Sequence, residues 1–233
     1  MASPTTGILN GRPPPLEAGD RLTRAEFERR YEAMPHLKKA ELIEGVVYMP
    51  AAVRYRGHGR PHSWMVTWLG HYESETLGVF GADNTSVRLD LDNEPQPDGV
   101  LFIEPRCGGQ VAISDDDYIE GSPELAVEVA SSSVSYDLGD KLNAYRRNGI
   151  QEYLVWRVLD GEFDWFELRE GRYEKLEADA QGVLRSNVFP GLWLDTKALL
   201  AGNLKGALAT LQQGVASQEH NDFLQRLQPP SAS

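Results

Sequence analysis

The sequence predicts a mixed α/β domain with a central β-sheet flanked by helices. Apolar residues make up 41% of its 233 residues, which is enough for a buried core. Helix-like and strand-like segments alternate along most of the chain, which is typical of helices packed on a sheet. The segment 123–130 is short, almost wholly apolar and rich in valine, which favours a strand buried on both faces.

The first half of the chain is predicted to contain two helices and four strands. A helix begins at Thr23, which forms a capping box with Glu26, and it ends near Pro35. Residues 41–49 form a strand with a turn or bulge at Gly45. A second helix ends at Gly78, and its apolar or semi-polar stripe consists of His62, Met65, Val66, Leu69 and Tyr72. Three further strands are predicted at 79–80, 85–91 and 99–103.

The second half is predicted to hold a buried strand, a helix, a run of hairpins and a helical end. A polar loop spans 104–118, and a helix spans 136–147 and closes at Asn148-Gly149. Strands at 152–158, 162–168 and 173–176 are linked by Asp-Gly and Glu-Gly turns. Residues 195–227 are helical, with a stripe of Leu199, Leu200, Leu204, Leu208 and Leu211. We therefore divide the chain into a flexible leader (1–20), a main domain (21–201), and a C-terminal helical extension and tail (202–233).

Composition restricts the class of protein. The single cysteine, Cys107, excludes an internal disulfide, and no apolar run has the length of a membrane helix. Without a signal-like N-terminus, we expect a cytoplasmic protein. The net charge of −12 opposes binding through many phosphate contacts, although it says nothing about where the charges lie.

Asp98 is the first candidate for chemistry. It follows Pro97, precedes Gly99 and stands at the start of a predicted buried strand, where an unpaired carboxylate is costly. Its side chain therefore either closes a Pro-Asp-Gly turn or holds a cation.

Glu128 interrupts the apolar run of the predicted buried strand. Alternation places it on the same face as Ala126 and Ala130, whose small side chains leave room around the carboxylate. In an interior strand such a glutamate needs a partner or a metal. The alternative is an edge strand with Glu128 facing water.

Lys141 lies in the following helix, beside its buried stripe. It either pairs with Asp137 one turn earlier or reaches the two carboxylates across the strand-to-helix turn. Two carboxylates and a lysine suit phosphodiester hydrolysis. The acids hold Mg²⁺ or Mn²⁺, and the lysine orients the attacking water, helps deprotonate it, or stabilises charge. Glu41 and Glu44 are candidates for a further acid.

The chain resembles the Uma-two family of endonucleases, a branch of the restriction-endonuclease-like PD-(D/E)XK superfamily. The resemblance covers roughly residues 22–200, and its pieces occur in the family's order. They are Glu41–Gly45, His62, Gln96-Pro-Asp98, Pro123–Val129, Ser131–Ser133, Asp137 with Lys141 and Tyr145, Gly149–Tyr153 and Pro190–Leu192.

The resemblance implies a restriction-endonuclease-like core and metal-dependent cleavage of DNA, often by a homodimer. It makes Asp98, Glu128 and Glu41 the metal-binding acids. Ala130 stands where the motif's lysine is usual, so that role passes to Lys141. Glu44 and His62 are possible accessory residues, and His62 is equally typical of a helix cap or a core position. One departure is Val155-Trp156-Arg157, where the family more often has an aspartate.

Two other functions remain open from the sequence. The acidic charge favours a binding or regulatory module that keeps the nuclease fold without robust catalysis. A metal-dependent hydrolase of another phosphodiester would use the same residues, and substrate panels would separate it from a DNA nuclease.

Overall fold

The computed structural model describes residues 13–49 and 53–228. Most of the predicted leader and the tail from Pro229 therefore lie outside the described residues. None of the described helices is both long and apolar enough to cross a membrane.

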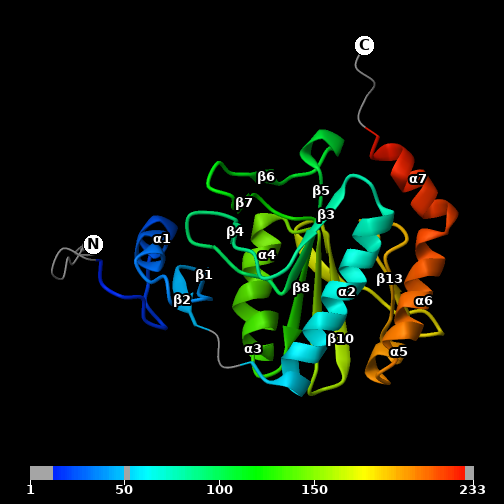
Figure 1. Ribbon diagram of the computed structural model, residues 1–233, viewed down its shortest axis with the longest axis horizontal. Helices are drawn as coiled ribbons and strands as arrows, with labels where there is room; N and C mark the ends of the chain where they lie inside the picture. Colours follow the sequence, from blue (N-terminus) through cyan, green and yellow to red (C-terminus); the bar gives the residue numbers. More distant parts are fainter. Residues whose placement is uncertain (1–12, 50–52, 229–233) are drawn as a thin grey trace, which may run out of the picture.

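A six-stranded mixed sheet forms the centre of the protein (Figure 1). The strands β8 and β9 are parallel, and the other neighbouring pairs are antiparallel. Across the sheet the order is β11 (Arg172–Lys175), β10 (Glu162–Arg169), β9 (Glu152–Arg157), β8 (Leu125–Ala130), β5 (Gly99–Ile103) and β3 (Val79–Ala82). This arrangement confirms the predicted class, a central mixed sheet flanked by helices.

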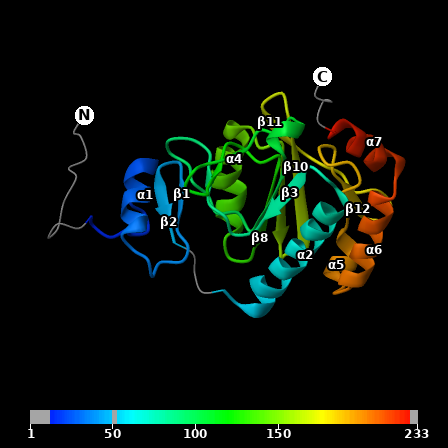
Figure 2. The same cartoon turned by 45° about the horizontal axis from the view of Figure 1, so that its top comes forward.

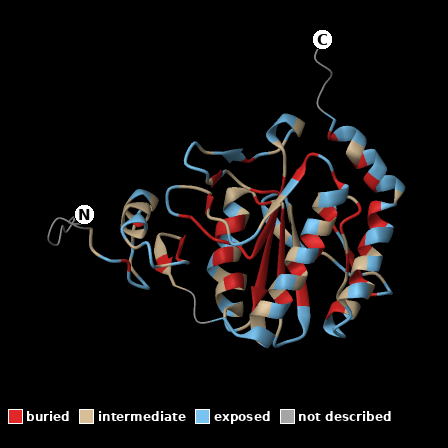
Figure 3. Ribbon diagram, in the orientation of Figure 1, coloured by how far each residue is buried: buried red, intermediate tan, exposed pale blue. Residues whose placement is uncertain are grey.

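Helices cover both faces of this sheet, and the alternation of β8 explains why. Val127 and Val129 face the helices α2 (Arg60–Glu75) and α6 (Leu204–Val215), which bring Trp68 and Leu211 into the same core. Ala126 and Ala130 of β8 point to the other face of the sheet and share a core there with Tyr145. That face carries α3 (Val134–Tyr136), the π-helical turn η3 (Asp137–Lys141) and α4 (Leu142–Asn148). Figure 3 shows the buried strands between these two helical layers.

The N-terminal residues form a small unit with its own core, beside the main sheet (Figure 2). It contains α1 (Arg24–Glu32) and the hairpin of β1 (Glu41–Ile43) and β2 (Val46–Tyr48), which turns at Glu44 and Gly45. The φ angle is 53° at Glu44 and 71° at Gly45. Such positive values are adopted most easily by glycine, which explains why a glycine stands in this turn. The predicted capping box is wrong, because the Thr23 side chain makes no cap hydrogen bond and Glu26 instead accepts from Arg29 and Arg30.

Several short elements were not predicted. The loop 104–118 contains a 3-10 turn, η2 (Pro105–Cys107), and a strand, β6 (Ala112–Ile113), which pairs with β7 (Ile119–Glu120). β7 also pairs with β4 (Val87–Arg88), which is shorter than the strand predicted at 85–91. A separate hairpin that was not predicted joins β12 (Val183–Arg185) to β13 (Trp193–Asp195). Two or three residues are too few to display a period of two, so the sequence pattern could not reveal β6, β7, β12 and β13.

The C-terminal helical segment is divided into three helices. They are α5 (Thr196–Leu200), α6 and α7 (Gln218–Arg226), and the side chains of Asn203 and Ser217 cap the last two. Leu200 is 45% exposed, so its place in the predicted apolar stripe is wrong. Leu211, Phe223 and Leu227 belong to the main core with α2 and the sheet. The region beyond residue 202 is therefore packed into the same core as the sheet.

Candidate functional site

Asp98 and Glu128 come together because their strands are antiparallel neighbours. Gly99 pairs with Val127, so one further step in the same register places Asp98 opposite Glu128. Each residue is only 4% exposed. Asp98 Oδ2 accepts a hydrogen bond from the backbone N–H of Val129, at 2.8 Å. The edge-strand alternative for Glu128 is wrong, since β8 lies between β5 and β9.

Lys141 reaches the same place from the turn η3 and is 2% exposed. Its Nζ lies 2.7 Å from Glu128 Oε1 and 2.9 Å from Glu41 Oε1, whereas Asp137 Oδ1 is 4.0 Å away. The local pair with Asp137 is thus secondary to the two longer-range pairs. We call Glu41, Asp98, Glu128 and Asp137 the acid cluster, and Lys141 contacts three of its four members.

Two further groups fix this arrangement. The Tyr145 hydroxyl donates to Glu128 Oε1 at 3.0 Å, and the backbone N–H of Gln96 donates to Glu41 Oε1 at 2.7 Å. Glu41 belongs to the N-terminal hairpin, while Glu128 belongs to the central sheet. The lysine therefore joins two units of the fold at the acid cluster.

The cluster carries more negative charge than its surroundings accommodate easily. Burial raises the pKa of Glu128 to about 8; Lys141 opposes this rise, and Asp98, Asp137 and Glu41 add to it. Burial also raises the pKa of Asp137. For Lys141, burial opposes the charge, but Glu128 and Glu41 outweigh it and hold the pKa well above its ordinary value. The lysine is accordingly a fixed cation beside Glu128 and Asp137, whose protonated forms burial favours.

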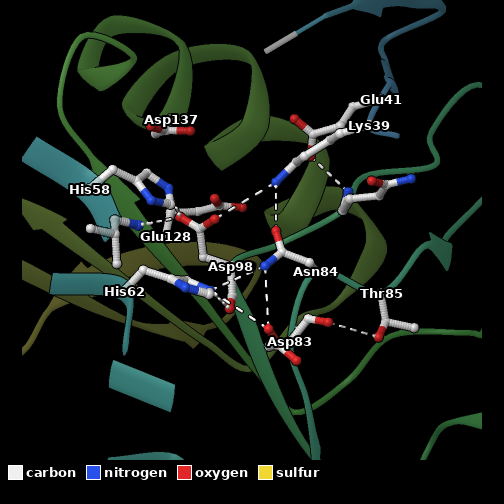
Figure 4. Close-up of polar contacts among 12 residues, drawn as sticks. Lys39, Glu41, His58, His62, Asp83, Asn84, Thr85, Asp98, Glu128 and Asp137 are labelled. Atoms are coloured by element: carbon white, nitrogen blue, oxygen red, sulfur yellow. Dashed lines mark hydrogen bonds and ion pairs between the residues drawn. The ribbon is translucent and has the colours of Figure 1, made fainter. Parts of the chain in front are cut away.

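Asp98 has a different environment on its outer side (Figure 4). His58 Nε2 lies 3.2 Å from its Oδ2, and Lys39 Nζ lies 3.7 Å from its Oδ1. Burial works against ionisation, but His58, Lys39 and the Val129 N–H outweigh it and lower the pKa of Asp98 to about 2. Asp98 is thus the ionised member of a pair of carboxyl groups whose pKa values are pushed apart.

His62 and Asn84 surround the same strand end. His62 Nε2 lies 3.0 Å from the backbone oxygen of Asp98, and the Asn84 side chain contacts both His62 and Lys39. The structure therefore brings together Asp98, Glu128, Lys141, Glu41 and His62. Glu44 is not part of this group, because it lies in the hairpin turn and pairs with Arg147 on the surface.

Sequence reasoning missed Lys39, His58 and Tyr145 as members of the site. Lys39 precedes Glu41 by two residues, a spacing that places both on one face of an extended segment and could have indicated it. His58 lies in a glycine-rich stretch with no periodic pattern, so nothing local distinguishes it. Tyr145 is one of the pieces that carry the family resemblance, but no role at the site was predicted for it.

The donor set is compatible with a small divalent cation. Among residues 13–49 and 53–228, no three His, Cys, Asp or Glu side chains form a ready metal centre. Lys141 lies within 3 Å of both Glu41 and Glu128. Mg²⁺, however, commonly binds one or two carboxylates and completes its shell with water and phosphate oxygens. Asp98 and Glu128 supply such a pair, and Glu128 Oε2 accepts no hydrogen bond from the described residues.

Comparisons with known proteins agree with this description. The family model Uma2, described as "Putative restriction endonuclease", matches residues 24–197. A crystal structure from Anabaena variabilis ATCC 29413, described as a putative nuclease belonging to DUF820, aligns with a TM-score of 0.53 and 14% sequence identity. The alignment covers 70% of this chain and 90% of that one. No curated protein matches the sequence.

The protein thus has an α+β fold that resembles the structure described as a putative nuclease. The chain belongs to the Uma2 family of putative restriction endonucleases. This membership confirms the resemblance that the sequence motifs indicated.

Proposed function

We propose that this protein is a Mg²⁺- or Mn²⁺-dependent DNA endonuclease whose site is the acid cluster with Lys141. The observation that carries the proposal is the placement of Asp98 opposite Glu128, with Lys141 Nζ 2.7 Å from the latter. Family membership supports the nuclease class. The substrate, the metal and the homodimeric state expected from the resemblance belong to the proposal.

Asp98 and Glu128 would hold the cation through their carboxylate oxygens. When bound, the cation would polarise the phosphate and acidify the attacking water. It would also offset the repulsion between the two acids, which favours the ionised form of Glu128. Because a cation and a proton would compete for Glu128, binding of the metal would release a proton.

Lys141 would act as a fixed positive charge. Its raised pKa keeps it protonated, so it can orient the water or stabilise charge on the phosphate, but it is poorly suited to removing a proton. Glu41 and Tyr145 would hold Lys141 and Glu128 in position. In the structure Lys141 and the backbone N–H of Gln96 both contact Glu41 Oε1, so a role as metal ligand would fall to Oε2.

The test is cleavage of plasmid, linear duplex and single-stranded DNA with Mg²⁺ or Mn²⁺. We expect wild type to cut, and Asp98→Asn, Glu128→Gln and Lys141→Met to lose at least 100-fold in rate, as is typical of removing one electrostatic catalytic group (roughly 10²–10³). Glu44→Gln is the matched control, since it removes a hairpin carboxylate outside the site.

The possible results separate the candidate functions. If well-folded wild type cuts no DNA, the binding or regulatory module that the −12 charge favours becomes the better account. If it cuts a different phosphodiester, the site stands and the substrate class changes. Equal cutting by wild type and by all three site variants would place the activity elsewhere.

A further inference from the structure

The longest stretch of this acidic chain without any carboxylate reaches the candidate site. Residues 45–72 include none of the 35 acidic residues but carry three arginines and three histidines. Within it, the basic segment, residues 54–60, runs from Arg54 through the π-helical turn η1 (Tyr55–Gly59) to Arg60, the first residue of α2. The net charge of −12 therefore does not describe the surface beside the site.

Arg54 and Arg56 of the basic segment are available to a ligand, whereas Arg60 stacks over the Trp64 ring at 4.5 Å. Arg54, Arg56 and Arg60 are exposed, and none of them forms an ion pair with any of the described residues. By contrast, carboxylates pair with several other arginines, namely Arg29, Arg88, Arg147, Arg157 and Arg169. Arginines left without carboxylate partners on an acidic protein are suited to phosphate groups.

Tyr55 stands between two of these arginines and is 69% exposed. Among the described aromatic and cationic side chains, none stacks on its ring. A large exposed aromatic group flanked by arginines is the combination that binds single-stranded nucleic acid, because a base stacks on the ring while the cations contact the backbone. In a duplex the bases are already stacked on one another and cannot use such a platform.

The basic segment is fixed against the strand that carries Glu128. A Cβ on Gly57 would lie 2.9 Å from Ser131 Oγ, so the segment packs closely on the residue that follows β8. One residue further, His58 Nε2 contacts Asp98 Oδ2 at 3.2 Å. The basic segment therefore lies directly beside the acid cluster, which is buried next to it.

We propose that the basic segment binds the substrate strand next to the scissile phosphate, with an unpaired base stacked on Tyr55 and the backbone held by Arg54 and Arg56. This proposal rests on the nuclease function proposed above. It adds that the preferred DNA has a single-stranded stretch at the site.

The experiment measures binding and cleavage separately. Binding of a fluorescent single-stranded oligonucleotide and of the matching duplex is followed by anisotropy, with Ca²⁺ replacing Mg²⁺. Tyr55→Ala should weaken single-strand binding about tenfold, the scale of one base-aromatic stack, and leave duplex binding unchanged, while Tyr55→Phe keeps the affinity. Far-ultraviolet circular dichroism confirms that each variant is folded.

The arginines are tested with a matched charge control. Arg54→Ala with Arg56→Ala should weaken binding and reduce the slope of log affinity against log salt by about 1.4, because each single-strand phosphate contact contributes about 0.7. Arg172→Ala with Arg226→Ala removes the same charge from exposed positions on β11 and α7, and should leave both values unchanged.

The proposal would be overturned if Tyr55→Ala bound the single strand as tightly as wild type does. It would also be overturned if the two double arginine variants weakened binding equally. Its failure is distinguishable from failure of the nuclease function. If wild type and Tyr55→Ala cut single-stranded DNA at the same rate, only the basic-segment proposal would be contradicted. Tyr55-dependent binding without any cutting would support the segment and contradict the nuclease.

Discussion

At the scale of single residues, Lys141 is the centre of the candidate site. It is almost completely buried and contacts carboxylates from the hairpin and from the central strand. Charges removed from water in this way are tolerated only when they are paired and hydrogen-bonded. The stability and the proposed chemistry of the site therefore depend on the same lysine.

Removing that lysine alone should destabilise the protein. Lys141→Ala leaves Glu128 and Glu41 buried without their cation, and the free energy of unfolding should fall by about 3–5 kcal/mol. The loss should be smaller at pH 5 than at pH 8, because the acids can take up protons at the lower pH. Urea unfolding monitored by circular dichroism measures both values.

Two further variants test this explanation. Lys141→Met with Glu128→Gln removes both charges together and should recover part of the loss, whereas Lys205→Met changes an exposed lysine and should have little effect. A double variant that is no more stable than Lys141→Ala would show that packing, rather than charge, accounts for the loss.

At the scale of elements, the C-terminal helices illustrate how close packing limits substitution. α6 approaches the loop before β13 so closely that a Cβ on Gly214 would lie 2.1 Å from the backbone oxygen of Gly191. A Cβ on Gly70, in the middle of α2, would meet nothing within 4 Å. The same substitution in two helices should thus have opposite effects.

Gly214→Ala should lower the melting temperature, because neither backbone can move without disturbing the core around Leu211. Gly70→Ala should raise it slightly, since alanine favours a helix over glycine by roughly 0.5–1 kcal/mol. Differential scanning calorimetry of both variants and of wild type measures these melting temperatures. A neutral Gly214→Ala would mean that α6 is not packed as closely as described.

At the scale of the whole molecule, a buried junction joins the N-terminal unit to the rest. Arg88 of β4 pairs with Glu28 of α1 at 2.8 Å and with Asp116 at 2.8 Å. Glu94 exchanges backbone hydrogen bonds with Leu42 of β1 and is 1% exposed. Burial, and then the neighbouring Glu28, raise the pKa of Glu94 to about 8, while Arg88 opposes the rise.

This junction should make stability depend on pH. Unfolded, Glu94 loses its proton near its ordinary pKa of 4.5; folded, it keeps the proton up to about pH 8. Between these values the folded protein binds more protons, so a rise in pH favours unfolding. The free energy of unfolding of wild type should therefore fall relative to Glu94→Gln from pH 5 to pH 8. Parallel pH profiles of the two proteins would contradict this assignment.

The sequence by itself determined the class of fold and the identity of the main residues of the candidate site. The valine-rich strand, the alternation around Glu128 and the hairpin turns are local patterns, and local patterns reflect the periods of strands and helices. The order of motifs, from Glu41 through Asp98 and Glu128 to Lys141, also sufficed to indicate the family that the comparison confirmed.

Only the tertiary structure decided how these residues meet. The register of β5 on β8 places Asp98 opposite Glu128, and the docking of the hairpin brings Glu41 to Lys141. His58 and Lys39 are likewise joined to Asp98 by contacts between segments far apart in the chain. Such contacts depend on pairing and packing at long range, which no period within a single segment encodes.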